Sequence, residues 1–303
     1  MNSKAITTIG AWAHVNLSVP QSGKILATFS NTIYLLTDDA ELFWIVSDNQ
    51  SMHRRALKTP ALPAGPQSGS PFQTANHRLT IDPDIFLDFG TASIWHEPQI
   101  NPQNTIEITK IPTRLQTLFS ALDLSQAKGF GKVIPALLRF LQNNPTDLPS
   151  PSHDLILARA RPFILNIAHA CLTNQPSHIS QNFDALIGLG NGLTPSGDDF
   201  LGGVLFALKI LHTAYPNQCT AYAINLEPYR ARTHPISFAL LQDHANGHAI
   251  EPLHDILNGI LSKTPPHNID SLIAQLTRIG HSTGWDLLAG LLTGLLSTHR
   301  KRD

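Results

Sequence analysis

The spacing of apolar residues changes at Pro112, and this change limits the folds that the chain can adopt. Before Pro112 the apolar residues gather in short segments rich in β-branched and aromatic side chains, with turn-forming residues between them. After Pro112 they recur at helical spacing. Strands that precede helices along the chain, without alternating with them, indicate an α+β protein.

We therefore expect two domains, a β-rich N-terminal domain over 1–112 and a larger α-helical domain over 113–303. The strand-like segments predict an antiparallel sheet or a small barrel, and they lie near 5–19, 24–29, 31–37, 41–47, 79–97 and 105–110. Helical periodicity predicts helices over 113–123, 131–143, 153–173, 197–214, 218–231, 235–246, 249–262, 269–280 and 284–299.

The chain carries little charge, which excludes several classes of protein. Charged residues make up 14% of the 303 residues, and the formal net charge is −1. A disordered chain would carry more charge, and a general nucleic-acid binder would carry a basic excess. No apolar run reaches the roughly 20 residues that span a bilayer, and the N-terminus lacks the apolar core of a signal peptide. We expect a soluble cytoplasmic protein that binds neither nucleic acid nor membrane.

The most informative segment is the stretch 188–203, GLGNGLTPSGDDFLGG. Glycines at alternate positions permit positive φ, and the helix that follows adds N–H groups and the positive end of its dipole, so the stretch predicts an anion site. It is not a Walker A loop, since no Gly-Lys-Ser/Thr follows, and Leu193 replaces the third glycine of a dinucleotide fingerprint. The alternative is a capping box, with Ser196 as N-cap and Asp199 closing the box, which leaves Asp198 unexplained.

A second segment, 281–290, repeats this pattern. When Thr283-Gly284-Trp285-Asp286 is aligned with Ser196-Gly197-Asp198-Asp199, the hydroxyl, glycine and carboxylate positions coincide. One hypothesis is that two helix N-termini converge on one pocket, each offering N–H groups and a carboxylate. The alternative is two ordinary capped core helices.

Histidines are the remaining candidates for chemistry. His281 immediately precedes the second segment, and imidazole titrates near neutral pH, which suits acid–base work or anion binding. A histidine hydrogen-bonded in a loop between helices is the alternative. His244 and His248 have the i, i+4 spacing of zinc helices, but no Glu follows His244 and Gly247 is expected to end the helix. We expect neither a metal nor a cofactor.

The stretch 188–203 resembles the signature of the AllH family, and the segment 280–290 resembles the C-terminal signature of that family. Between these two stretches, three short motifs of the chain resemble a further segment of the family: Thr233-x-x-x-Ser237, Ala245-x-Gly247 and Glu251-Pro252-Leu253. The similarity covers roughly 180–295, and the β-rich first third offers no sharp motif.

The resemblance implies a subunit of an oxamate carbamoyltransferase, which works with an FdrA-like subunit and a third partner in anaerobic allantoin breakdown. The reaction is phosphorolysis of oxalurate to oxamate and carbamoyl phosphate, and these small anions suit the predicted site. In this interpretation Asp198, Asp199 or Asp286 holds the carbamoyl NH₂ group, N–H dipoles stabilise the attacked carbonyl, and His281 moves the proton. The expected substrate-binding residues are Gly188, Gly190, Asn191, Gly192, Thr194, Ser196, Gly197, Ser282, Thr283 and Gly284.

Two other functions remain open at this point. The chain is a non-catalytic, partner-binding subunit of such a complex, or it is a metal-dependent hydrolase that uses Asp198 and Asp199. Stabilisation of the isolated chain by carbamoyl phosphate favours the first function, activity only with partner chains favours the second, and bound metal favours the third.

Overall fold

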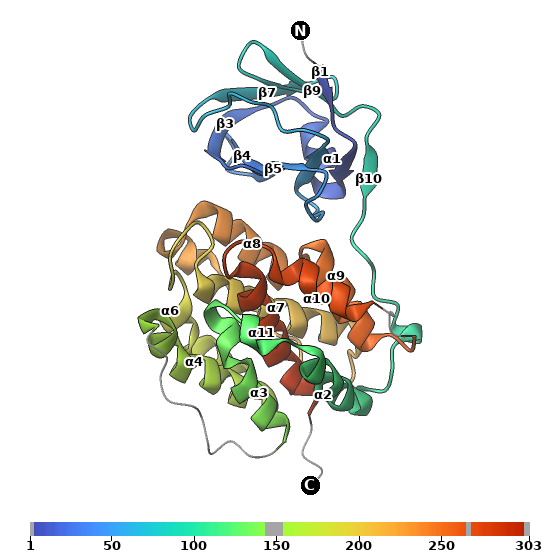
Figure 1. Ribbon diagram of the computed structural model, residues 1–303, viewed down its shortest axis with the longest axis vertical. Helices are drawn as coiled ribbons and strands as arrows, with labels where there is room; N and C mark the ends of the chain where they lie inside the picture. Colours follow the sequence, from blue (N-terminus) through green and yellow to red (C-terminus); the bar gives the residue numbers. More distant parts are fainter. Residues whose placement is uncertain (1–2, 143–153, 265–267, 300–303) are drawn as a thin grey trace. The chain divides into compact units, whose positions relative to one another are not determined.

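The computed structural model describes residues 3–142, 154–264 and 268–299. Contacts divide the chain into two compact units, Met1–Glu97 and Pro98–Asp303 (Figure 1). This division falls earlier than the predicted boundary at 112, because Ile106 and Ile108 already pack in the core of the second unit. The α+β prediction is confirmed, since the first unit is built on one sheet and the second is helical.

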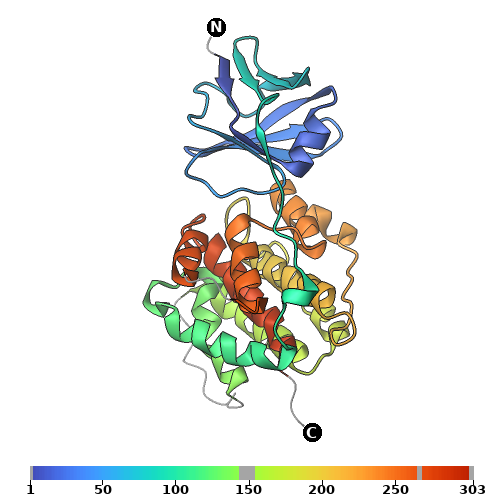
Figure 2. The ribbon, with the colours of Figure 1, turned by 90° about the vertical axis from the view of Figure 1, so that its right-hand side faces the viewer.

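The first unit is a ten-stranded sheet that curls until both of its ends pair with one chain segment (Figure 2). The N–H of Ile6 donates to Asp88 O on β9, and the N–H of the next residue, Thr7, donates to Lys58 O on β6, both at 2.8 Å. The strands are β1 (Ser3–Ala5), β2 (Thr8–Gly10), β3 (Gln21–Thr28), β4 (Thr32–Thr37), β5 (Leu42–Ser47), β6 (Ala56–Thr59), β7 (Pro71–Ala75), β8 (Arg78–Ile81), β9 (Ile85–Asp88) and β10 (Ser93–Trp95). Their order is β1-β9-β8-β7-β3-β4-β5-β6-β2-β10.

The sheet is mixed, although the sequence predicts an antiparallel one. The pairs β1–β9, β5–β6 and β2–β10 are parallel, and the other neighbours are antiparallel. Alternate residues of β4, such as Ile33 and Leu35, are buried on the inner face, as a period of two requires.

In the first 112 residues the strand prediction near 5–19 holds only at β2, and the one near 105–110 is wrong. Residues Ala11–Leu17 form helix α1, whose Ala13 and Leu17 are buried at i, i+4 spacing. The segment predicted near 105–110 contributes only a bridge between Thr105 and Ser262, followed by a 3-10 turn over Ile108–Lys110.

The second unit packs its helices around α7 and α11, which lie side by side (Figure 1). Nearly every residue of these two helices is buried. Close approach is possible because glycines face each other: a Cβ on Gly203 would lie 2.3 Å from Leu287 O, and one on Gly290 would lie 2.0 Å from Phe200 O. The helices are α2 (Ile111–Ala121), α3 (Ile134–Leu141), α4 (Leu155–Leu172), α5 (Pro176–Gln181), α6 (Phe183–Leu186), α7 (Ser196–Ala214), α8 (Pro235–Ala245), α9 (Glu251–Leu261), α10 (Ile269–Thr277) and α11 (Thr283–Leu295).

The helix predicted over 218–231 is wrong. The chain there runs without regular structure and ends in a 3-10 helix, η5 (Glu227–Arg232). Pro228 lacks a backbone N–H donor and stands in the first turn of η5, where proline is tolerated, so it favours a short helix that begins there. The short helices α5 and α6 are too brief for periodicity to reveal.

Among the described residues, α4 is the one helix with the length and hydropathy of a membrane span. Seven of its residues, including Ile164 and Ile167, are buried in the core of the second unit. A core helix of a soluble protein has the same length and composition, so α4 is weak evidence of a membrane segment.

Candidate functional site

The first turns of α7 and α11 meet through two pairs of hydroxyl groups. Ser196 Oγ lies 3.4 Å from Ser282 Oγ, and Thr194 Oγ1 lies 3.1 Å from Thr283 Oγ1. Each pair joins a residue in or just before the first turn of α7 to one in or just before the first turn of α11, so the two similar sequence segments are also neighbours in space. The hypothesis that the two N-termini converge therefore rests on direct contacts.

The hydroxyl groups do not cap their helices. Pro195 is the N-cap of α7, and Ser282 is the N-cap of α11 without a side-chain cap hydrogen bond. The capping-box alternative for Ser196 and Asp199 is wrong for this reason. The hydroxyls of Ser196 and Ser282 instead lie close to each other and to the Asp286 carboxyl.

The glycine-rich loop uses positive φ at three positions, as the sequence predicts. Gly188, Gly190 and Gly192 have φ of 72°, 133° and 93°. Two of them also allow close approach, since a Cβ on Gly188 would lie 2.2 Å from Arg232 O and one on Gly190 would lie 2.6 Å from Ser196 N. Only Gly192 has open space around its Cα. The first two glycines therefore shape the loop, and the third leaves room beside it.

Gly197 and Gly284 have equivalent packing roles at the starts of α7 and α11. A Cβ on Gly197 would lie 1.9 Å from Leu186 O, and a Cβ on Gly284 would lie 1.8 Å from Leu276 O. Because both glycines lack a side chain, each helix N-terminus packs directly against the end of a preceding helix. The structure gives them a packing function and no exposed face toward a ligand.

Asp198 is buried and ties the loop to the start of α8. Its Oδ1 accepts the N–H of Gly188 at 2.6 Å, and its Oδ2 accepts the hydroxyls of Thr233 and Ser237, the latter at 2.6 Å. Burial raises the pKa of Asp198, and these three hydrogen bonds oppose the increase. Because both oxygens accept hydrogen bonds, Asp198 is placed to hold the loop against the start of α8.

Asp199 and Asp286 are two buried carboxyl groups beneath the hydroxyl pairs. Burial raises the pKa of Asp199 well above its usual range, and the nearby Asp286 carboxylate raises it further, while the Thr283 and Thr194 hydroxyls lower it. Burial likewise raises the pKa of Asp286 to about 6, against hydrogen bonds from the Phe130 N–H and from two serine hydroxyls. Within the described ranges, Oδ2 of each aspartate has no hydrogen-bond partner. An unpartnered buried oxygen favours the protonated carboxyl.

A cavity of about 470 Å³ opens beside the serine pair. Its lining combines residues of the two predicted segments with residues that the sequence did not single out. The lining residues are Ala127, Lys128, Gly129, Phe130, Lys132, Asp154, Ile156, Asn191, Gly192, Ser196, His281 and Ser282. The volume lies in the range of ordinary small-molecule sites.

The structure divides the predicted site residues into two groups. Asn191, Gly192, Ser196, His281 and Ser282 line the cavity. The rest lie behind its wall or in the packing of the loop; they are Gly188, Gly190, Thr194, Gly197, Asp198, Asp199, Thr283, Gly284 and Asp286. His281 is exposed at the cavity, which suits proton exchange with a bound ligand.

Sequence reasoning missed the lysine-bearing part of the site, Lys128-Gly129-Phe130-Gly131-Lys132. Its N-terminal neighbours carry no motif, and it forms a 3-10 helix, η4 (Gly129–Val133), where the sequence predicts the start of an α-helix. A signal was present, because two lysines and two glycines within five residues are unusual in a chain with so few charges.

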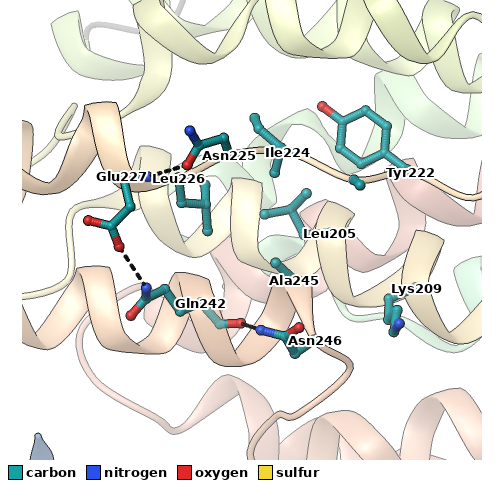
Figure 3. Close-up of a pocket in the computed structure, with 11 residues that line it drawn as sticks. Leu205, Lys209, Tyr222, Ile224, Asn225, Leu226, Glu227, Gln242, Ala245 and Asn246 are labelled. Atoms are coloured by element: carbon teal, nitrogen blue, oxygen red, sulfur yellow. Dashed lines mark hydrogen bonds between the residues drawn. The ribbon is translucent and has the colours of Figure 1, made fainter.

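A second cavity, of about 280 Å³, lies between α7, α8 and the irregular segment before η5 (Figure 3). Gln242 Nε2 donates to Glu227 Oε1 at 3.3 Å on one side of it, and Lys209 and Tyr222 lie on the other. It shares no residue with the cavity beside the serine pair. Among the described residues, no cluster of three or more His, Cys, Asp or Glu side chains is arranged to hold a metal.

No solved structure matches the chain significantly. The family model of AllH, described as oxamate carbamoyltransferase subunit AllH, matches residues 186–295. This range begins just before the glycine-rich loop and ends with α11, so it contains both hydroxyl pairs and the buried Asp198, Asp199 and Asp286. The segment that builds the convergent helix N-termini is thus the part of the chain that matches the AllH family model, as the sequence resemblance indicates.

Proposed function

We propose that this chain is the small-anion-binding subunit of a carbamoyltransferase that acts on oxalurate, oxamate, phosphate and carbamoyl phosphate. The observation that carries the proposal is the contact between Ser196 and Ser282 at the edge of a cavity, where two helix N-termini meet. Helix dipoles attract negative charge at their N-termini, and two hydroxyls and a loop with positive φ offer hydrogen bonds to it. The match to a carbamoyltransferase subunit supports the same chemistry.

The proposed reaction places the developing charge at this site. A phosphate oxygen attacks the carbamoyl carbon of oxalurate, the bond from that carbon to the oxamate nitrogen breaks, and the nitrogen takes up a proton. The products are carbamoyl phosphate and oxamate. Hydroxyl donors and helix dipoles stabilise the charge on the attacked carbonyl oxygen. His281, exposed at the cavity, supplies the proton to the leaving nitrogen.

In this proposal the buried carboxyl groups position the hydroxyl-bearing residues that they contact. Asp286 lies behind Gly129 and the serine pair, so its part is to hold Ser196 and Ser282 in place. Asp199 does the same for the threonine pair. A metal-dependent hydrolase that uses Asp198 is less well supported, because hydrogen bonds occupy both oxygens of this carboxylate.

Partner subunits and a cytoplasmic location belong to the same proposal. The family is named for one subunit of an enzyme, so turnover is expected from a complex. The FdrA-like chain that the sequence resemblance implies is the expected partner in this complex. In the partner-binding alternative the isolated chain binds none of the four anions, and the chemistry resides in the other subunits.

The proposal is tested by thermal-shift titration of the full chain with carbamoyl phosphate, phosphate, oxamate and oxalurate. At one hundred times the dissociation constant a ligand stabilises the protein by about 2.7 kcal/mol, which is a visible shift in Tm. We expect a saturable shift that the double variant Ser196→Ala/Ser282→Ala loses. Ser271→Ala, an exposed serine on α10, is the matched control and keeps the shift. The proposal fails if none of the anions binds, with or without the partner subunits.

A further inference from the structure

We propose that Lys128 and Lys132 form a phosphoryl-binding subsite on one wall of the cavity beside the serine pair. The ligand class is a phosphate dianion or an acyl phosphate. The inference rests on the proposed function only in sharing its cavity, and it assigns a part of that cavity that lies outside the matched residues 186–295.

The loop that carries the two lysines is held firmly against the first turn of α11. Asp286 Oδ1 accepts the N–H of Phe130 at 2.6 Å. Gly129 has a φ of 49°, and a Cβ there would lie 2.4 Å from Asp286 Oδ1 and 2.8 Å from Ser282 Cβ. Gly131 packs equally closely on Trp285, since a Cβ on it would lie 2.9 Å from the Trp285 Cβ. The lysines therefore extend from a backbone whose position relative to the serine pair is set.

The charges that face the cavity favour an anion on the lysine side. Lys128 and Lys132 line it together with His281, and Asp154 is the acidic residue of the lining. Asp154 Oδ1 accepts the N–H groups of Ile156 and Leu157 as the N-cap of α4, and its Oδ2 lies 3.9 Å from Lys132 Nζ. The Lys128 carbonyl accepts the N–H of Gly131, but the Lys128 ammonium group has no hydrogen-bond or ion-pair partner within the described part of the chain.

The other acidic groups near the cavity are the buried Asp286 and Asp199. Neither lines the cavity, and burial raises the pKa of both, which reduces the negative charge behind the lysine wall. Two ammonium groups and one half-exposed carboxylate therefore face the cavity. This excess of positive charge suits a doubly charged phosphoryl group.

The helix N-terminus alone supplies few donors, which makes the lysines necessary. The N–H of Gly197 donates to Leu189 O, and those of Asp198 and Asp199 donate to Pro195 O. The first turn of α7 therefore contributes its dipole, the serine pair contributes hydroxyls, and the charged donors come from the lysine loop. The cavity is large enough for a phosphoryl group at the lysines and a carbamoyl or carboxylate group at the serines.

The test is calorimetric titration of the full chain with inorganic phosphate, carbamoyl phosphate and oxamate. The variants are Lys128→Gln and Lys132→Gln, with Lys128→Arg and Lys132→Arg to restore the charge. Lys110→Gln is the matched control, because Lys110 is exposed just before α2 and forms an ion pair with Glu107, three residues away. Each Gln variant should weaken phosphate and carbamoyl phosphate binding by about tenfold or more, which is typical of losing one charged hydrogen bond.

Oxamate binding in the same variants should change by less than about twofold, and the Arg variants should bind phosphate nearly as well as the wild type. The inference is overturned if phosphate binds the Gln variants as it binds the wild type, or if oxamate is weakened as much as phosphate. A wild-type chain that binds oxamate but no phosphate also overturns it while leaving the proposed function standing. Failure of all three ligands to bind the wild type counts against both.

Discussion

Gly203 of α7 and Gly290 of α11 lie in contact at the crossing of the two central helices, where a Cβ on Gly290 would be 3.0 Å from the Gly203 Cα and 2.0 Å from Phe200 O. No side chain larger than hydrogen fits between these backbones. This contact brings the two N-termini close enough for Ser196 and Ser282 to meet. The geometry of the site thus depends on a packing contact two turns away from it.

Gly290→Ala should destabilise the protein strongly. An added methyl group in this contact must push α7 and α11 apart, and overpacking of this kind costs about 1–3 kcal/mol or more. Urea unfolding followed by circular dichroism measures the change. Thr213→Ala, at an exposed position on α7, is the control and should stay within about 0.5 kcal/mol of the wild type. Equal stabilities for the two variants would contradict the close helix contact.

Asp198→Ala should lower both stability and ligand binding. The substitution leaves the Gly188 N–H and the hydroxyls of Thr233 and Ser237 without their acceptor, at about 1–3 kcal/mol for each buried group that finds no water. Ser237→Ala removes one of these hydrogen bonds and should cost about 1 kcal/mol. Denaturant titration of both variants decides whether Asp198 holds the loop. If Asp198→Ala keeps wild-type stability but loses turnover, Asp198 acts on the substrate instead.

The contribution of Asp286 to the stability of the protein should fall as the pH rises from about 4 to about 6. The pKa of Asp286 is raised to about 6 in the folded chain, so across this window the unfolded chain has released a proton that the folded chain still binds. The contribution of Asp286 to the free energy of unfolding is therefore greatest below the ordinary pKa of an aspartate. It decreases up to the raised pKa, by about 3 kcal/mol for a shift of this size. The raised pKa of Asp199 acts in the same direction.

Asp286→Asn removes the contribution of this one group. Unfolding free energies measured between pH 4 and pH 7 should therefore depend less on pH in the variant than in the wild type. The stability of the variant relative to the wild type should increase through the window as the wild type loses its proton-linked stability. Parallel curves for the two proteins would show that Asp286 titrates normally.

His281→Ala should reduce turnover without affecting the fold. The side chain is exposed, so the unfolding free energy should change by less than about 0.5 kcal/mol. If His281 moves the proton to the leaving nitrogen, kcat of the assembled enzyme should fall by about 10²–10⁴-fold. His178→Ala, at an exposed position on α5, is the control for losing a surface imidazole. Unchanged kcat in His281→Ala would remove this residue from the mechanism.

Part of the site was predictable because its chemistry is local. The positive φ of Gly188, Gly190 and Gly192 follows from glycines at alternate positions before a helix. The similarity of the segments at Ser196 and Thr283 is written in adjacent residues and needs no knowledge of packing. The roles of individual carboxylates were not predictable in this way: Asp198 and Asp199 are neighbours in sequence, yet one has both oxygens occupied and the other has an unpartnered oxygen.

By itself, the sequence determined the local periods, and with them the order of a β-rich part and a helical part, most of the helices after Pro112, and the resemblance of 186–295 to AllH. Only the tertiary structure decided that α1 follows the first two strands and that the sheet closes through Ile6 and Thr7. It also decided that Lys128 and Lys132 line the same cavity as the serine pair. The physical reason is sequence separation. Hydrogen bonds and side-chain periods act over a few residues, whereas the contact of Phe130 with Asp286 joins positions that only the packing of η4 against α11 brings together.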